Sequence, residues 1–246
     1  MRATNYNSDS NLLKYLNANQ RTGAGLLGLN TDKTTESLNV IAQKYAAAKT
    51  KSTSSTGNVS SVISSEASNL NKVYEQIKQN GNKDALAGFN QAVMNYTKNS
   101  DATGLKNFIE TGVKAGNDKN MASFVNTLAI ANNISKQTPS SANQFLSEAV
   151  NTYSQSGVQS MNDYAKAASS IISKSGANSL QTSSAKASVL GNLTAAWKAT
   201  SGQSKVSAAQ IKTQLNDISS NVSKLGDLKT VNDYLNAKIR QVKTGI

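Results

Sequence analysis

The chain has 246 residues and a formal net charge of +12, with 26 Lys and Arg residues against 14 Asp and Glu residues. It contains no Cys and no His, which excludes disulfides, thiol nucleophiles, and thiolate or imidazole groups for metal binding and acid–base catalysis. Hydrophobic residues make up 37% of the sequence and aromatic residues only 5%, and there is a single Pro. Small apolar side chains with few large ones, and so little Pro, favour an all-α fold of about nine closely packed helices.

The N-terminal third combines weak apolar patterns with polar breaks. Residues 1–32 are interpreted as a mobile arm, either disordered or becoming ordered on a partner. Residues 33–80 are expected to form N-terminal helices, with a polar linker at about 50–57. The helix expected from Asn58 to Gln79 carries a heptad pattern, interrupted once by Glu66. Its predicted seam consists of Val59, Ile63, Leu70, Val73 and Ile77.

The central region, residues 82–202, repeats a pattern in which an apolar residue precedes an aromatic residue by three positions. The pairs are Leu86 with Phe89, Leu105 with Phe108, Met121 with Phe124, Ala142 with Phe145, and Met161 with Tyr164. The aromatic residues are roughly sixteen to twenty-one positions apart, which fits one short helix and one turn per repeat. We therefore predict a bundle of successive antiparallel helices with a shared aromatic core. Trp197 is expected to close that core, and the alternative is an exposed contact residue.

Each predicted repeat begins at a helix-capping residue. The proposed starts are Asn82 or Asp84, Ser100–Asp101, Asn117–Asp118 and Thr138–Pro139. Pro suits the first helical position because the N–H that it lacks would have no partner within the helix there.

The C-terminal region, residues 204–246, returns to a heptad pattern. Ser207 and Gln210 form a predicted capping box, and after Gly226 a last helix follows. The predicted seam consists of Ile211, Leu215, Ile218, Val222 and Leu225. This helix either pairs with Asn58–Gln79 as an antiparallel coiled coil, or both helices pack on the central bundle.

The positive charge has two explanations, a soluble surface or attraction to an anionic partner. The lysines are spread along the chain, and only three residues are Arg, the usual bidentate reader of phosphate and guanine. The candidate anion contacts are Lys72, Lys78, Lys238 and Lys243. The carboxylates of Glu148 and Asp163 have no partner in the sequence pattern for catalysis, so we expect no enzyme, metal, cofactor or small-molecule substrate.

No segment approaches the roughly 20 apolar residues of a membrane-spanning helix, and the N-terminus has no apolar core of a secretory signal peptide. The protein is therefore expected to be either cytoplasmic or exported without a cleavable signal peptide.

Both ends of the chain resemble the axial and filament proteins that bacteria export through flagellar or type III secretion channels. The similarity lies in the opening Met1-Arg2-Ala3-Thr4-Asn5, the polar helix at Thr35–Tyr45, and the heptads at Val59–Ile77 and Ile211–Val242. It implies a structural protein whose terminal helices coil together, and it carries over no individual functional residue. The expected function is a structural or protein-interaction scaffold that assembles through the two seams. The alternative is a basic module that coats nucleic acid, like a capsid protein, with steeply salt-dependent binding.

Overall fold

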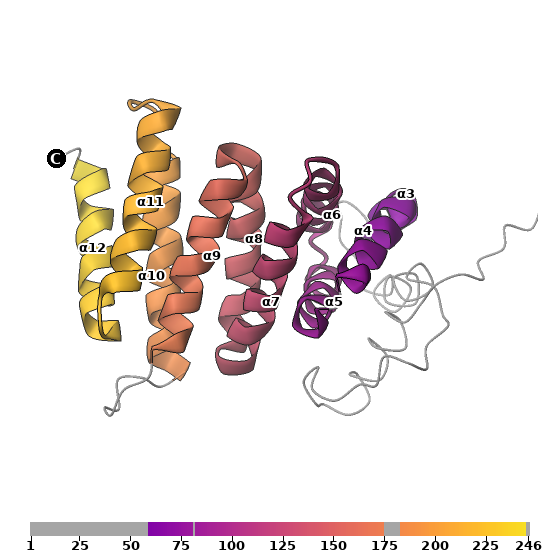
Figure 1. The fold of residues 1–246 in the computed structure, drawn as a ribbon, viewed down its shortest axis with the longest axis horizontal. Helices are drawn as coiled ribbons and strands as arrows, with labels where there is room; N and C mark the ends of the chain where they lie inside the picture. The colour runs from indigo at the N-terminus through magenta and orange to yellow at the C-terminus, as the bar shows by residue number, and fades with distance from the viewer. Residues whose placement is uncertain (1–58, 81, 175–182, 245–246) are drawn as a thin grey trace, which may run out of the picture. The chain divides into compact units, whose positions relative to one another are not determined.

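The computed structural model of the chain describes residues 59–80, 82–174 and 183–244. The regular secondary structure of these residues is entirely α-helical, which confirms the predicted all-α fold (Figure 1). The predicted arm at 1–32, the first N-terminal helix and the linker at about 50–57 lie outside the described residues.

Ten helices span the described ranges. They are α3 (Val59–Ser65), α4 (Ala67–Gln79), α5 (Lys83–Lys98), α6 (Ala102–Asn117), α7 (Met121–Gln137), α8 (Pro139–Ser156), α9 (Val158–Ser173), α10 (Ser183–Ser201), α11 (Ala208–Lys224) and α12 (Leu228–Thr244). The chain divides between Ala122 and Ser123 into two compact units, called unit 1 and unit 2. This division falls inside the range 82–202, for which the sequence predicted a single helical bundle.

Unit 1 is built around a chain of aromatic rings. α4 packs on α5 and α6, and α3 packs on α4 and α6. The ring centroids of Tyr74 and Phe89 lie 6.1 Å apart, and those of Phe89 and Phe108 lie 5.4 Å apart. Tyr96 adds a further ring, 5.8 Å from Phe108. Phe89 and Phe108 have no solvent-exposed surface, so these contacts form the apolar core of the unit.

The first heptad segment is divided in the structure. Where a single helix was expected from Asn58 to Gln79, α3 ends at Ser65 and α4 starts at Ala67. Glu66, the polar residue in the heptad, lies at the break, and its Oε2 accepts a hydrogen bond from Asn69 Nδ2 at 2.7 Å. The predicted seam is nonetheless continuous, because all five of its residues are buried. These are Val59, Ile63, Leu70, Val73 and Ile77.

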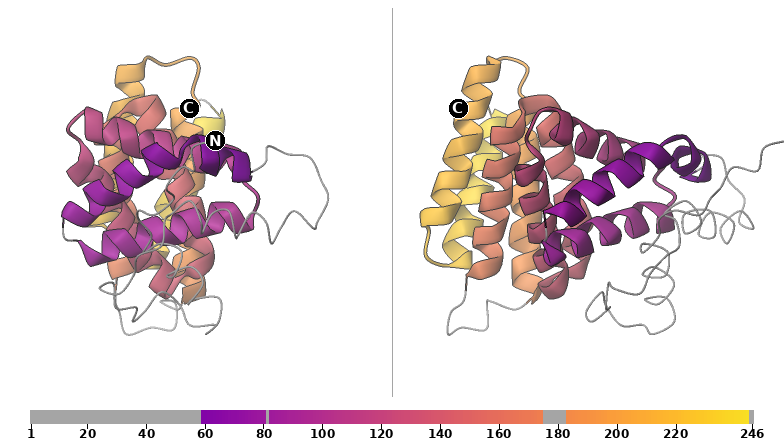
Figure 2. Two further views of the ribbon diagram at one scale, coloured as in Figure 1. Left: turned by 90° about the vertical axis from the view of Figure 1, so that its right-hand side faces the viewer. Right: turned by 45° about the vertical axis from the view of Figure 1, so that its right-hand side comes forward.

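Unit 2 arranges its helices in two layers. α8, α10 and α12 lie side by side in one layer, and α9 and α11 lie side by side in the other (Figures 1 and 2). α7 contacts α9, since Asn162 Nδ2 donates to Ser123 Oγ at 3.1 Å. α9 and α10 therefore each pack on helices of their own layer and of the opposite layer.

The aromatic residues of α8, α9 and α10 form the centre of unit 2. Phe145 stacks on Tyr164 with ring centroids 5.3 Å apart, and Tyr164 lies 5.0 Å from Trp197. Trp197 is fully buried and its Nε1 donates to Thr152 Oγ1 at 3.0 Å, so the alternative of an exposed contact residue is wrong. Phe124 of α7 is also buried, with 1% of its surface exposed.

The two heptad segments belong to different units. In unit 2, α11 packs on α9 and α10, and its residues Leu215, Ile218 and Val222 have no exposed surface. The seam of α4 is buried in the same way among the helices of unit 1. Each heptad helix thus packs on neighbours within its own unit. At the two ends of the α11 seam, Ile211 and Leu225 are partly exposed.

Three of the predicted helix starts are confirmed by their hydrogen bonds. The side chain of Asn82 accepts from Ala85 N at 2.9 Å, and that of Asp101 accepts from Gly104 N at 2.8 Å. Ser207 caps α11 in a complete capping box.

Two other predictions about helix starts need correction. Asn117 is the last residue of α6 and Asp118 its C-cap, so α7 starts later, at Met121. Asn and Asp occur at both ends of helices, and here the backbone N–H of Asp118 donates to Lys114 O at 2.8 Å, so the residue types alone did not distinguish an end from a start. α8 does begin at Pro139, but Thr138 is no side-chain cap, because its Oγ1 donates back to Ile134 O at 3.1 Å.

A single glycine joins α8 to α9. Gly157 has φ 85° and ψ 179°, a left-handed conformation that costs little without a side chain. Because α8 ends at Ser156 and α9 starts at Val158, this one residue reverses the chain and places the two helices against each other.

Candidate anion-binding pocket

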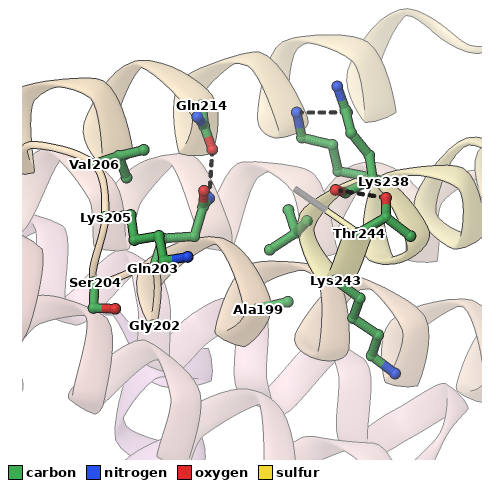
Figure 3. Close-up of a pocket in the computed structure, with 12 residues that line it drawn as sticks. Ala199, Gly202, Gln203, Ser204, Lys205, Val206, Gln214, Lys238, Lys243 and Thr244 are labelled. Carbon is green, nitrogen blue, oxygen red and sulfur yellow. Dashed lines mark hydrogen bonds between the residues drawn. The ribbon is translucent and has the colours of Figure 1, made fainter. Parts of the chain in front are cut away.

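A pocket of about 760 Å³ opens at one end of unit 2. It is formed by the end of α10, the connection to α11, the middle of α11 and the last turns of α12 (Figure 3). We call it the lysine pocket, because Lys205, Lys238 and Lys243 line it and none of its described lining residues has a carboxylate side chain. Its volume falls within the roughly 300–1,000 Å³ range of ligand pockets.

Local hydrogen bonds hold the α10–α11 connection that forms one wall. α10 ends at Ser201, and Gln203 Nε2 donates to Thr200 O at 3.3 Å and to Gln214 Oε1 at 2.7 Å. Figure 3 shows this bridge between Gln203 and Gln214. The Ser207 capping box then starts α11. The wall is therefore fixed to α10 and to α11.

The pocket lies in the more basic unit. Residues 123–246 contain twelve of the 26 basic residues and five of the 14 acidic residues, a net charge of +7. Lys238 Nζ donates to Gln241 Oε1 at 3.2 Å. Within the described ranges, Lys205 and Lys243 make no hydrogen bond or ion pair, so their ammonium groups are available to an anion.

The lysines of α12 do not converge on one point. Lys238 and Lys243 are five positions apart, which separates them by about 140° around the helix axis and about 7.5 Å along it. Figure 3 shows their side chains extending in opposite directions. One small ion could not contact both of them, so this arrangement suits an anionic group that extends along the pocket.

Lysines in the last turns of α12 also have a structural effect, since cations there complement the partial negative charge of the helix C-terminus. That effect accounts for Lys243, which lies in the last turn. It does not account for Lys205, which lies between α10 and α11 and lines the same pocket.

The structure divides the four candidate anion contacts predicted from the sequence between the two units. It brings Lys238 and Lys243 to the lysine pocket, whereas Lys72 and Lys78 lie on α4 of unit 1. Lys72 Nζ donates to Asn117 Oδ1 at 3.2 Å. Lys78 pairs with Glu75 at 3.8 Å.

The other main lining residues were not selected from the sequence. They are Ala199, Gln203, Lys205, Val206, Gln214, Gln241 and Val242. Val242 is the last residue of the heptad range Ile211–Val242, but nothing in its neighbourhood indicated a pocket. The only available signal was a lysine, Lys205, in a polar connection between two helices.

Glu148 is a buried carboxylate that pairs with an exposed lysine. It is 4% exposed, and the ammonium of Lys198 lies 3.6 Å from its Oε2. Burial raises the pKa of the Glu148 carboxyl above its ordinary value of 4.5, and Lys198 opposes this shift. Burial also raises the pKa of the Tyr164 phenol, whose oxygen shares a 2.8 Å hydrogen bond with Thr194 Oγ1.

Asp163 likewise connects α9 to α11. Its carboxylate accepts hydrogen bonds from Gln159 Nε2 at 3.2 Å and Asn216 Nδ2 at 3.3 Å. Its backbone carbonyl accepts one from Ser219 Oγ at 2.7 Å. Through the contacts with Asn216 and Ser219, Asp163 positions α11 on α9. The buried carboxylates of Glu148 and Asp163 therefore have different partners.

Two further features of the described residues bear on the kind of site. Their carboxylates form no group of three or more that could hold a metal ion. None of the helices in these ranges is long and apolar enough to cross a membrane.

The chain matches no protein-family model, no curated protein and no solved structure. The resemblance of its ends to exported axial and filament proteins therefore stays a prediction.

Proposed function

We propose that the protein is a non-enzymatic interaction module that binds an anionic region of a partner protein in the lysine pocket. The observation that carries this proposal is the composition of the pocket. Three lysines and no Asp or Glu are among the described residues that line it, and Ala199, Val206 and Val242 add apolar surface. Such a site can attract, orient and release an anionic partner without catalysing a reaction.

The expected affinity follows from the exposure of the lysines. An exposed ion pair contributes about 0.2–1 kcal/mol, so three lysines together supply about 0.6–3 kcal/mol. Salt screens this contribution, because the groups are accessible to solvent. Apolar contacts with the pocket must supply the rest, and the partner would exchange quickly and dissociate as the salt concentration rises.

Assembly through the heptad seams receives less support than partner binding. Leu70, Val73, Leu215 and Ile218 have no exposed surface, so they could contact a second chain only if a unit opened. A structural role, and an association with a flagellar or secretion apparatus, stay predictions that would need another surface.

Site-specific photo-crosslinking in cells that produce the protein tests the proposal. p-Benzoylphenylalanine would replace either Gln241, which lines the pocket, or Lys212, which is exposed on α11 outside the pocket. We expect a covalent adduct of one defined protein mass from position 241, and none from position 212. Equal adducts from both positions, or none from position 241, would contradict the proposed function.

A further inference from the structure

We propose that the lysine pocket selects an extended acidic peptide segment, with carboxylates spaced along it, rather than a phosphate group or a nucleic acid. This inference rests on the proposed function, and it specifies the chemistry of the partner.

The positions of the cations favour a ligand with several separated charges. Lys238 and Lys243 extend in opposite directions from α12, and Lys205 comes from the opposite wall of the pocket (Figure 3). A single phosphate is best held by groups that converge on it, as a guanidinium fork does. Carboxylates along a peptide can instead meet the lysines one at a time.

The described residues that line the pocket include no helix N-terminus. Phosphates bind at helix N-termini, where backbone N–H groups have no partner. At the nearest such end, α11, Gln210 N donates to Ser207 Oγ, and Ser207 N donates to Gln210 Oε1 at 2.8 Å. α12 contributes its C-terminal turns, whose carbonyl groups accept hydrogen bonds and cannot donate them to a phosphate.

Amide side chains in the lining match a peptide backbone. Gln203 uses its Nε2 for two internal hydrogen bonds, but its Oε1 accepts none from the described residues. Gln214 accepts through Oε1, and its Nε2 donates to none of these residues. One unused acceptor and one unused donor therefore lie on neighbouring side chains of one wall, where they can pair with the N–H and C=O groups of an extended chain.

The remaining surface of the pocket favours aliphatic side chains over nucleobases. Ala199, Val206 and Val242 are each partly exposed in the lining. None of the lining residues that the structure describes is aromatic. Proteins that bind single-stranded nucleic acids without sequence preference combine a basic groove with aromatic rings on which bases stack, and this lining lacks such a platform.

Fluorescence anisotropy with defined probes tests the inference. The probe is a fluorescein-labelled dodecapeptide of glutamate, leucine and glycine, and its matched control carries glutamine in place of every glutamate. A labelled dodecathymidylate and inorganic phosphate as a competitor represent the other anions. The protein variants are Lys205→Gln and Lys238→Gln in the pocket, with Lys212→Gln as a charge-matched control outside it.

We expect the glutamate peptide to bind and the glutamine peptide to bind at least tenfold more weakly. Each pocket substitution should weaken binding roughly two- to fivefold, as removing an exposed ion pair does, and Lys212→Gln should change it less than twofold. Circular dichroism should show the same helix content in all variants. Affinity for the glutamate peptide should also fall as salt is raised.

Three results would overturn the inference. Binding of dodecathymidylate or phosphate, but not of the peptide, with loss on Lys238→Gln would reject the acidic peptide and leave the pocket as an anion site. Peptide binding that Lys212→Gln weakens as much as Lys238→Gln would assign the effect to net charge. If none of the probes binds while position 241 still crosslinks to a partner, the acidic chemistry is wrong but the interaction function stands.

Discussion

The hydrogen bond between Trp197 and Thr152 offers a direct test of how α8 and α10 are held together. Trp197 is the only tryptophan and has no exposed surface, and Thr152 is 2% exposed. The indole N–H and its acceptor are both withdrawn from water, so removing either one leaves the other without a partner in an apolar environment.

The magnitudes follow from these contacts. Trp197→Phe removes the 3.0 Å hydrogen bond and part of the packing on Tyr164, and should cost about 2–3 kcal/mol of unfolding free energy. Thr152→Val leaves the indole N–H without an acceptor and should cost about 1–3 kcal/mol. In the double variant neither partner remains, so its cost should be about 1 kcal/mol less than the sum of the two single costs.

Urea unfolding followed by far-ultraviolet circular dichroism measures these values, because Trp197→Phe removes the only indole fluorophore. In the wild type, native tryptophan emission should lie at short wavelength and resist quenching by iodide. Costs that add within about 0.3 kcal/mol in the double variant would show that the hydrogen bond does not couple the two residues. Emission typical of an indole in water would refute the burial of Trp197.

Two further predictions concern buried polar groups in unit 2. Burial raises the pKa of the Glu148 carboxyl, so the folded state binds its proton more tightly than the unfolded state does. The stability that this proton contributes is therefore present below pH 4.5, and it is lost as the pH rises through the raised pKa. Glu148→Gln should therefore become more stable relative to wild type between acidic and neutral pH in urea midpoints, and a constant difference would contradict this reasoning. Thr200 Oγ1 is buried without a hydrogen-bond partner among the described residues, so Thr200→Val should leave the thermal midpoint unchanged or raise the stability by up to about 1 kcal/mol; a loss of that size would show that the hydroxyl has a partner.

Local signals in the sequence were sufficient where near neighbours determine the structure. Asn82, Asp101 and Ser207 satisfy N–H groups only three positions away, and their effect can be read from a short stretch of sequence. The repeated aromatic positions depend on helical periodicity alone, and Phe89 and Phe145 are buried accordingly.

Features that depend on packing between distant residues were not predictable. Lys205, Gln214 and Lys238 line one pocket only because α10 packs on both α11 and α12. The sequence around Asp163 did not predict the hydrogen bond that its carboxylate accepts from Asn216, which is 53 positions away. Heptad periodicity indicated that α4 and α11 each bury one face, but the pattern does not specify which helix covers that face.

The most direct test of the central claim is a nuclear magnetic resonance titration of the full chain with the glutamate dodecapeptide. The account predicts shifts in the backbone amide signals of Gln203, Val206, Gln241 and Val242, which line the pocket. Lys72 and Lys78, which lie on α4, should show no such shifts. Shifts distributed evenly over the lysines of both units, with none concentrated at the lysine pocket, would contradict the claim that this pocket is the binding site.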